Sequence, residues 1–400
     1  LDIVSRYASQ WRLTYNTSKS KFIIFHKGRQ PTVDLELCFG ESVITNTDSV
    51  KYGGVLISSD MSCRERVLAS CQKARQTVNS LKSLGLNSTD LHPLTSVNIW
   101  KRMILPTSFY GCELLPELRG KDIELIESTQ RYFARCIQGL SKRSSTNSAI
   151  ANLGLWSMMG YIDKCRLLFL GRLCNNQCDS ATKMLFCASI SLHIESAKTP
   201  ASICATCTLL RTAKRYDLIT YVINYIECGN FPTKASWRNI VVKAIARSEE
   251  NQWRAALSVR EDMNRYAKVH TQLSLHNLYS LFYNYPEYRS SLQLVINVIS
   301  RGKVSRTCAQ CLTHCFDHDC HVILHCEHYM QLRDSFYSEL IDTLEVETYV
   351  QIEMLDDDDV LSLFSGGNVL DNMNVTTRST IVLSFALYLS KLKTALVYSF

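Results

Sequence analysis

Cysteine and histidine are concentrated in one short segment, which constrains the fold more than any other feature of the sequence. Ten of the 21 residues from Cys308 to His328 are Cys or His. Four of them give the spacing C-x2-C-x9-H-x4-C, namely Cys308, Cys311, His321 and Cys326. A Cys-x2-Cys turn directs two thiolates at one point, and a later His and Cys complete the tetrahedron that zinc prefers. Four protein ligands leave no open coordination position, so we expect a structural zinc rather than a catalytic one.

Other interpretations of these side chains stay open. A disulfide-rich loop would use the same cysteines, although the rest of the chain does not resemble a secreted protein. Surplus residues of the segment could replace a ligand or build a second site that shares the segment; they are His314, Cys315, His318, Cys320, His325 and His328. The pair Cys204-x2-Cys207 has no second pair near it, and we interpret it as ordinary thiols rather than a metal site.

Outside this segment, the composition is that of a globular protein in a reducing compartment. Hydrophobic residues make up 46% of the chain, which is enough to bury a sizeable core. The 17 cysteines are odd in number, and most lie singly among apolar residues, as at Cys136 and Cys165. Such thiols usually act as small core residues of reduced proteins, so we expect an intracellular location. The apolar run from Ile381 to Leu389 is too short to span a bilayer, and we expect no membrane partner.

Charge is distributed unevenly along the chain. Residues 1–150 carry 20 Lys and Arg against 13 Asp and Glu, and residues 151–300 carry 17 against 10. Residues 301–400 reverse the balance, with 7 against 14. A basic body with an acidic tail fits a phosphate-binding surface on the first two thirds of the chain. Ordinary solvated surface explains so modest an excess equally well, so the charge alone does not choose between them.

The first part of the chain shows a change from strands to helices. Leu1, Val4 and Trp11 recur at helical spacing, and because the chain opens without Met inside this pattern, we expect the downstream part of a longer protein. Short β-strands should follow up to Ile57, with a tight turn at Gly40-Glu41.

From Asp60 onward the pattern is helical. Asp60 is the expected cap of the first long helix, and Thr89 or Asp90 is that of the second, which should end at Pro106. A third helix should cover about residues 122–140, and a basic loop at 142–148 is a candidate hinge. Residues 178–207 have little periodicity, and we expect irregular structure there.

Five short motifs follow one another along the chain. They are Trp11-Arg12-Leu13-Thr14-Tyr15-Asn16 with Lys19-Ser20 after it; Lys51-Tyr52-Gly53-Gly54-Val55-Leu56; Tyr110-Gly111-Cys112-Glu113; a helix with Gln130, Phe133 and Gly139; and the Cys/His segment with Tyr329 and Arg333 after it. Taken singly, each is an ordinary structural fragment. In this order they resemble the reverse transcriptases of non-LTR retrotransposons. The matching parts of that family are the end of the catalytic palm, the strand that leads into the thumb, the thumb-side helices and a zinc knuckle near the C-terminus.

This resemblance implies an α+β fold with a small β-rich palm remnant, a mainly α-helical thumb and a helical C-terminal region with a zinc knuckle. It divides the chain into a palm remnant, a thumb, a helical linker region, a CCHC zinc knuckle, and an acidic turn with a C-terminal helix. The corresponding residues are 1–59, 60–148, 149–300, 301–345 and 346–400.

The resemblance also implies an activity and partners. The family consists of RNA-directed DNA polymerases, so the expected partners are RNA and DNA, as an RNA–DNA hybrid with a primer terminus. Lys19 would lie near the departing pyrophosphate, where a cation stabilises developing negative charge, although a solvated lysine is the alternative. Tyr52 would help to hold the primer end. Cations of the thumb would follow the phosphates of the hybrid; these are Arg64, Lys73, Arg75, Lys101 and Arg102. In the knuckle, Phe316 or Tyr329 would stack on unpaired bases.

Two departures from the family limit what this chain can do. Gly53 stands where the family has Leu. More importantly, the paired aspartates that hold two Mg²⁺ ions for nucleotidyl transfer are missing. The family keeps them on an aromatic-x-Asp-Asp turn that precedes the segment matched here, and Met354-Leu355-Asp356-Asp357 is only a superficial match. We therefore expect Mg²⁺ in the complete enzyme only, and we expect this chain to bind nucleic acid and zinc without polymerising.

A different class of protein would explain the same residues. A helical, zinc-stabilised interaction protein without polymerase ancestry needs only the Cys/His segment and the amphipathic helices. Sequence upstream of Leu1 separates the two hypotheses, because only a polymerase requires paired carboxylates on a hairpin there.

Overall fold

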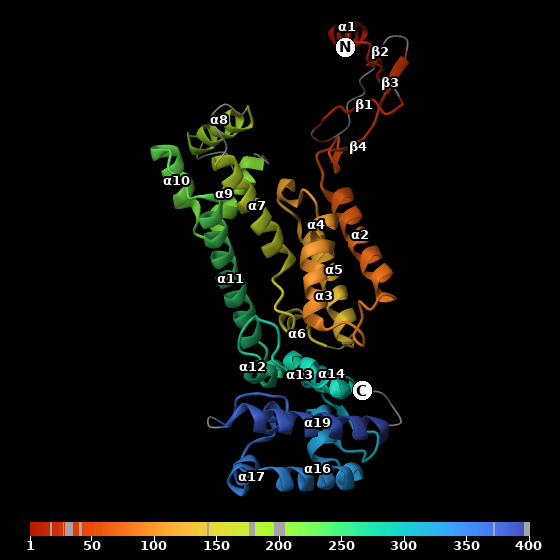
Figure 1. The fold of residues 1–400 in the computed structure, drawn as a ribbon, viewed down its shortest axis with the longest axis vertical. Coiled ribbons are helices and arrows are strands. Elements are labelled where there is room, and N and C mark those ends of the chain that lie inside the picture. The colour runs from red at the N-terminus through yellow and green to blue at the C-terminus, as the bar shows by residue number, and fades with distance from the viewer. Residues whose placement is uncertain are drawn as a thin grey trace.

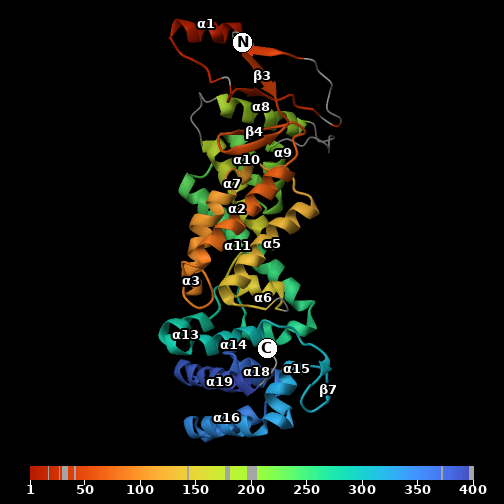
Figure 2. The same ribbon diagram turned by 90° about the vertical axis from the view of Figure 1, so that its right-hand side faces the viewer.

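The α+β expectation is confirmed by a structure that is mostly helical with a few small sheets. The computed structural model describes residues 1–16, 18–26, 28, 35–39, 42–141, 144–175, 181–195, 205–370 and 373–395. The molecule is elongated, with the small sheets at one end and the C-terminal helices at the other (Figure 1). Long helices occupy the middle, and the view from the side shows the same order from end to end (Figure 2).

The N-terminal end consists of a short helix and two small sheets. α1 (Asp2–Gln10) precedes a three-stranded sheet of order β1-β3-β2, built from β1 (Lys21–Phe22), β2 (Leu37–Phe39) and β3 (Ser42–Asn46). β1 runs parallel to β3, and β2 runs antiparallel to it. The turn expected at Gly40-Glu41 lies outside the described residues. This end buries few large side chains and leaves Ile3, Tyr7 and Trp11 exposed.

The Lys51–Leu56 motif forms a hairpin rather than one continuous strand. β4 (Ser49–Tyr52) pairs antiparallel with β5 (Val55–Ser58), and Tyr52 lies opposite Val55. Gly53 and Gly54 form the two-residue turn between them, with φ of 56° and 84°. Two consecutive positive φ angles are characteristic of the type I′ turn, which favours glycine. The glycine at position 53 therefore permits the turn that reverses the chain direction here.

Residues 64–138 form a helical bundle around a buried tryptophan. Its elements are α2 (Arg64–Lys82), α3 (Pro93–Ile99), a π-helix (Trp100–Ile104), α4 (Leu105–Ser108), a 3-10 turn (Cys112–Leu114) and α5 (Gly120–Gln138). Trp100 is fully buried and stacks on Phe133 at 4.3 Å between ring centroids. Its Nε1–H donates to Gln130 Oε1 at 3.3 Å. Two residues of the predicted thumb motif thus form the centre of this bundle.

The structure corrects the expected ends of two helices. α2 begins at Arg64, and Asp60 accepts the Ser62 N–H in the turn before it instead of capping the helix. α3 is capped by His92, whose Nδ1 accepts the Leu94 N–H, rather than by Thr89 or Asp90. Pro106 does not end this helix, which passes through the π-turn into α4. A wider turn accommodates the missing N–H of proline, which a regular helix interior would not tolerate.

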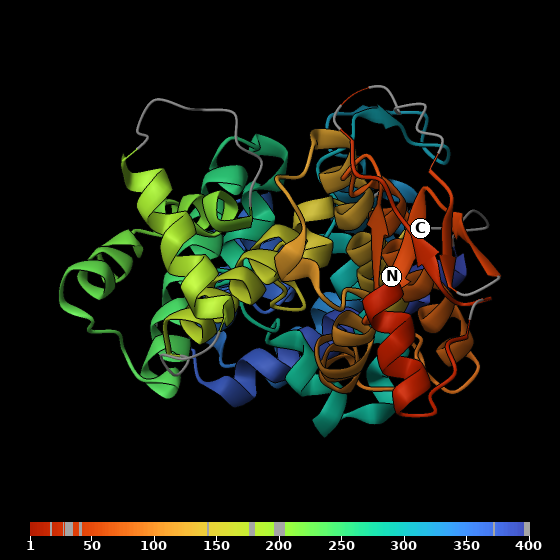
Figure 3. The same cartoon turned by 90° about the horizontal axis from the view of Figure 1, so that it is seen from above.

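A second layer of helices lies beside this bundle, as the view from above shows (Figure 3). It consists of α7 (Met158–Asn175), α8 (Ala181–Glu195), α9 (Ala205–Arg215), α10 (Ile219–Cys228) and α11 (Lys234–Ser258), with the short α6 (Thr146–Ala151) leading in. Trp237 of α11 fills the space over Gly171 of α7, where a Cβ would lie 2.1 Å from the indole ring. The expectation of irregular structure at 178–207 is wrong for the described residues 181–195, which form α8. Residues 142–143 of the expected hinge and 196–204 lie outside the described residues.

The C-terminal end is built on α14 and α19. A 3-10 turn (Glu261–Met263) and α12 (Asn264–Val269) lead to α13 (Leu278–Asn284), a second turn (Pro286–Tyr288) and α14 (Arg289–Ile299). After the Cys/His segment come α16 (Met330–Thr343), α17 (Val346–Glu353), α18 (Asp357–Phe364) and α19 (Val375–Ala395). α19 packs between α14 and α16, so its Phe385 and Leu389 are fully buried. Among the described residues, no helix is both long and apolar enough to cross a membrane.

A buried polar network joins the central bundle to the C-terminal end. The Asn152 amide donates to Gln138 Oε1 at 3.1 Å and to Ser300 Oγ at 2.9 Å. The hydroxyls of Tyr279 and Tyr266 donate to Gln138 Oε1 and Asn152 Oδ1, each at 2.8 Å. Because buried polar groups are costly unless they are paired, these bonds fix how α5, α6 and the helices after residue 260 meet.

Two carboxyl groups lie where α5, α7 and α11 meet. The start of α7 binds both, because Glu127 accepts the Met159 N–H at 3.2 Å and Glu249 accepts the Ser157 N–H at 2.6 Å. Burial raises the pKa of Glu127 to about 7, and the nearby charge of Glu249 adds to this effect. Arg131 is the positive group that opposes the shift.

We predict that Trp100→Ala lowers the free energy of unfolding by about 3–5 kcal/mol, because it removes a fully buried ring and leaves a cavity. Chemical denaturation followed by circular dichroism measures the change. The control is Tyr283→Ala, since Tyr283 is 81% exposed, and it should change stability by no more than about 0.5 kcal/mol. An equal effect of the two substitutions would contradict the packing described.

Glu127→Gln should stabilise the protein at high pH but not in acid. A carboxyl whose folded pKa is raised favours the folded state below its unfolded pKa, and this contribution is lost as the pH rises through the folded value of about 7. The Gln amide keeps the acceptor oxygen without the charge. The free energy of unfolding of the variant should therefore exceed that of wild type by about 1–3 kcal/mol at pH 8. Thermal unfolding at pH 4 and pH 8 tests this, and a gain of equal size at both would contradict it.

Candidate metal centre and nucleic-acid interface

A tight hairpin and a π-turn bring the four predicted zinc ligands together. Cys308 and Cys311 lie in the loop between β6 (Arg306–Thr307) and β7 (His314–Cys315). The loop is closed by hydrogen bonds from the Cys308 N–H to Thr313 O at 2.9 Å and from the Leu312 N–H to Cys308 O at 3.0 Å. After α15 (His318–Cys320), the π-helix His321–His325 places Cys326 beside His321, and the Cys326 N–H donates to His321 O at 2.7 Å.

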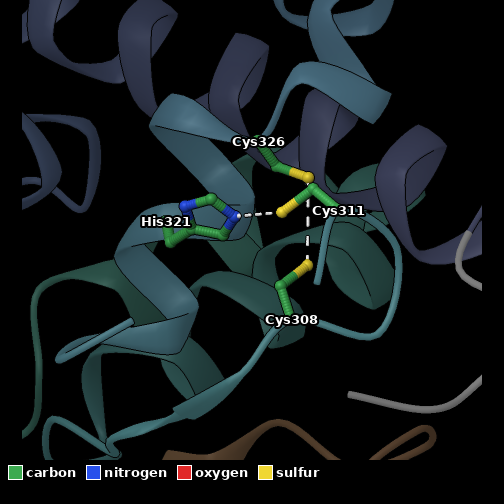
Figure 4. A group of neighbouring side chains, drawn as sticks. All are labelled: Cys308, Cys311, His321 and Cys326. Atoms are coloured by element: carbon green, nitrogen blue, oxygen red, sulfur yellow. Dashed lines mark hydrogen bonds between the residues drawn. The ribbon is translucent and has the colours of Figure 1, made fainter. Parts of the chain in front are cut away.

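The ligand atoms form a compact group (Figure 4). The Sγ atoms and the imidazole nitrogen of the four residues all lie within 4.8 Å of one another. Cys308 Sγ is 3.9 Å from Cys326 Sγ, and Cys311 Sγ is 3.2 Å from His321 Nε2. Zinc bonds of about 2.3 Å to sulfur and 2.0 Å to nitrogen require ligand separations of roughly 3.5–3.8 Å in a tetrahedron. The four side chains therefore fit a zinc ion.

A disulfide does not explain the same geometry. The 3.9 Å between the Cys308 and Cys326 sulfurs is far from the bond length of about 2.05 Å. Every cysteine in the described part of the chain is free. Hydrogen bonds from the Thr313 side chain and backbone lower the pKa of the Cys311 thiol to about 6, which favours the thiolate that metals bind.

The surroundings of the cluster hold its ligands in position. Cys308 and Cys326 are buried, and the Arg333 guanidinium donates to Cys326 O at 3.1 Å. Tyr388 of α19 donates to Ile323 O in the π-turn at 2.7 Å. Such second contacts orient the ligands of a metal, so Arg333 and Tyr388 connect the knuckle to the helices that follow it.

The surplus Cys and His residues lie outside the cluster of four. His314 is exposed on β7, Cys315 donates to Thr313 O at 3.2 Å, and His318 Nδ1 lies 2.9 Å from Arg306. The His328 ring packs edge-on against Tyr329. Cys320 and His325 face a different partner, Asp357 at the start of α18.

Aromatic side chains of the knuckle differ in their access to a ligand. Phe316 is 81% exposed, so a base could stack on its ring. Tyr329 is only 2% exposed, and the expectation that it stacks on bases is therefore wrong. Its ring packs in the core beneath the metal cluster.

Three of the predicted phosphate-binding cations connect α2 to its neighbours. Arg64 pairs with Asp122 at 2.6 Å, and Arg75 donates to Ser128 Oγ at 2.9 Å; both partners lie on α5. Lys73 donates to Thr107 O of α4 at 2.6 Å. Arg75 and Lys73 thus contact different helices, so one straight duplex would not meet both side chains on a single face of α2.

The remaining predicted nucleic-acid residues lie outside α2. Lys101 is exposed over its side chain as a whole, but its ammonium group donates to Gly154 O at 3.2 Å, and partial burial of that group lowers its pKa. Arg102 is exposed on the π-helix, and Tyr52 is 76% exposed at the tip of the β4–β5 hairpin. Lys19 is exposed in the turn after α1, where its N–H donates to Asn16. These roles stay predictions.

The acidic run at 356–359 is not a polymerase hairpin. Asp356 caps α18, accepting the Asp359 N–H at 2.7 Å, and the next three aspartates form the first turn of that helix. Carboxylates suit this position because they oppose the positive end of the helix dipole. The structure supports the interpretation of this run as superficial similarity to a catalytic turn.

Comparison with known proteins gives one distant similarity. A segment of this chain is 26% identical over 137 residues to the probable RNA-directed DNA polymerase from transposon X-element of Drosophila melanogaster. The match covers 34% of this chain and 15% of the length of that protein. No family profile matches the chain, and no solved structure matches it. A region of the chain is therefore similar to a transposon RNA-directed DNA polymerase.

The double substitution Cys308→Ser and Cys311→Ser should remove a tightly bound zinc. We expect about one zinc per wild-type chain to survive dialysis against a moderate chelator, and none at this site in the variant, because two of four ligands are gone. Mass spectrometry of the metal content measures this. Limited proteolysis should then cut the variant after Gly302 faster than wild type.

The matched control is the double substitution Cys38→Ser and Cys228→Ser, since both of these cysteines are exposed and lie far along the sequence from the knuckle. It should keep its zinc. Full metal retention in the Cys308/Cys311 variant would rule out this ligand set.

Proposed function

We propose that this chain is part of the RNA-directed DNA polymerase of a non-LTR retrotransposon, with the end of the palm, the thumb and a C-terminal zinc knuckle. The observation that carries the proposal is the 137-residue similarity to a transposon polymerase. The ordered motifs of the sequence agree with it. The proposal places the protein inside the cell, in the nucleus or the cytoplasm.

The β-rich end fits a palm fragment. Large apolar side chains are exposed along residues 1–59, including those of Ile3, Trp11, Phe25 and Val43. Exposed apolar surface of this extent is typical of a region that packs against another part of a protein. In the proposal, that part is the remainder of the palm, which would carry the carboxylates and the Mg²⁺ ions.

The junction between hairpin and bundle is the proposed primer-binding region. Tyr52 is exposed at the hairpin tip, and the Tyr110 ring lies against Gly54, where an added Cβ would be 3.4 Å from the ring. Tyr110 is itself 63% exposed. Two accessible aromatic rings at this junction could stack on a terminal base or sugar. Lys19, by resemblance, would meet the pyrophosphate in the complete enzyme.

The bundle itself is the proposed thumb. Its accessible cations, above all Arg102 and Lys101, would contact phosphates of an RNA–DNA hybrid. Such contacts position a duplex without reading its sequence. The knuckle would add a contact to unpaired nucleic acid through Phe316, which is exposed beside the metal cluster.

A specific observation also favours the alternative, a helical zinc-stabilised interaction protein. Arg64, Lys73 and Arg75 already bind partners within the bundle. The C-terminal hundred residues carry more acidic than basic side chains. Both features are ordinary for a protein whose partner is another protein.

Binding to a labelled RNA–DNA hybrid over a range of salt concentrations separates the two functions. If the thumb proposal is right, affinity should fall steeply as salt rises, because each phosphate contact releases counterions. Arg102→Ala should weaken binding at all sequences and reduce the salt slope by about 1. Tyr52→Ala should weaken binding to a hybrid with a recessed primer end more than to a blunt hybrid.

The control is Lys391→Ala, which removes an exposed cation paired with Glu339 on the C-terminal helices. It should leave hybrid binding unchanged. Undetectable or salt-insensitive binding by the wild-type chain would favour the interaction protein instead.

A further inference from the structure

A second group of metal-ligating side chains lies next to the zinc cluster. Cys320 Sγ, His325 Nε2 and a carboxylate oxygen of Asp357 lie within 4.8 Å of one another. Asp357 Oδ2 is 2.7 Å from His325 Nε2 and 3.5 Å from Cys320 Sγ. None of the three belongs to the cluster of Cys308, Cys311, His321 and Cys326. Sulfur, imidazole nitrogen and carboxylate oxygen are the three donor types that zinc accepts.

The π-turn explains why two groups arise from one short segment. The hydrogen bond from the Cys326 N–H to His321 O joins residues five apart, which is the pattern of a π-helix. In a regular α-helix, side chains five apart point about 140° away from each other. The wider turn brings such pairs toward the same side. His321 and Cys326 meet in the first cluster, and Cys320 and His325, one residue earlier, meet in the second.

The second group opens into a pocket, whereas the first is closed by its own ligands. Cys320, His325 and Asp357 line an open pocket of about 610 Å³. Cys320 is buried at its base, and the side chains of His325 and Asp357 are 52% and 53% exposed. Water therefore reaches the position that a fourth ligand would take.

Charge in the pocket favours a cation. Asp317 pairs with Arg265, and Asp358 pairs with both Arg265 and Lys303. Within the described part of the chain, the ion pair of Asp357 is with His325 alone, and neither Lys nor Arg reaches it. An ion bound between the three side chains would replace the direct 2.7 Å contact of Asp357 with His325 and neutralise the carboxylate.

We propose that Cys320, His325 and Asp357 form a second, open zinc-class metal site, with water as the fourth ligand. The donor set selects borderline metals such as Zn²⁺ and Co²⁺ over Mg²⁺ and Ca²⁺, which prefer oxygen alone. Two of its three ligands are half-exposed and one position belongs to water, so this site binds metal more weakly than the closed cluster. Metal here ties α18 to the knuckle through Asp357. The inference does not depend on the polymerase proposal.

Zinc titration of the full-length chain tests the site. After removal of weakly bound metal, the wild-type chain should hold one zinc and take up a second when Zn²⁺ alone is added. His325→Gln and Asp357→Asn should each abolish the second uptake and keep the first zinc. His314→Gln is the matched control, because His314 is an exposed histidine of the same segment outside both groups, and it should keep both zincs.

Cobalt gives a second measurement, and its main readout comes from the wild-type chain. Added Co²⁺ should bind the wild-type chain in two steps, and the weaker step should show the charge-transfer absorption of a single thiolate, which Cys320→Ser removes. Uptake of only one metal by the wild-type chain overturns the proposal. So does a second uptake that survives in both His325→Gln and Asp357→Asn.

Discussion

Burial of polar side chains around Asn152 is the constraint on which the rest of the structure depends. Asn152, Gln138 and Ser300 are wholly shielded from solvent, so each needs its hydrogen bonds from the others or from Tyr266 and Tyr279. The partners come from α5, α6, α12, α13 and the end of α14. A polar group in such a place tolerates few arrangements, whereas apolar packing tolerates many. The network therefore fixes the direction in which the C-terminal helices leave the central bundle.

A zinc ion bound by the four Cys and His side chains would apply a comparable constraint in the segment that follows α14. The strands β6 and β7 are two residues each, and α15 is three, so these elements have almost no intrinsic stability. Four ligands converging on zinc would hold them together, and Arg333 and Tyr388 extend that order to α16 and α19. In the proposed function, nucleic-acid binding or protein contact by this part of the chain would depend on a framework that a bound metal completes.

Local signals in the sequence were sufficient for some features and insufficient for others. The convergence of Cys308, Cys311, His321 and Cys326 was predictable, because the spacing of these residues is typical of one metal site. The third helix, expected at about residues 122–140, is α5, and it ends where Gly139 adopts a positive φ. The helix ends predicted from Asp60 and Pro106 were wrong. Asp60 accepts the Ser62 N–H in a turn before α2, and a π-helix carries the chain past Pro106. Hydrophobic periodicity indicates neither feature. Cys320 and His325 were named among surplus candidates, but Asp357 lies 32 residues beyond His325, and only the tertiary fold brings it near. The cations of α2 were named from the sequence, but their partners on α5 and α4 were not, because only the tertiary fold brings these helices together.

The position of α19 has a consequence for how the chain acquires its shape during translation. α14 packs against a helix that begins 76 residues after it ends. At ordinary rates of protein synthesis the ribosome needs on the order of 4–15 s to make such a stretch. During that interval the faces of α14 and of the knuckle that pack against α19 remain exposed to solvent. A chaperone at the ribosomal exit tunnel would therefore encounter the chain from α14 onward before the core of this region is complete.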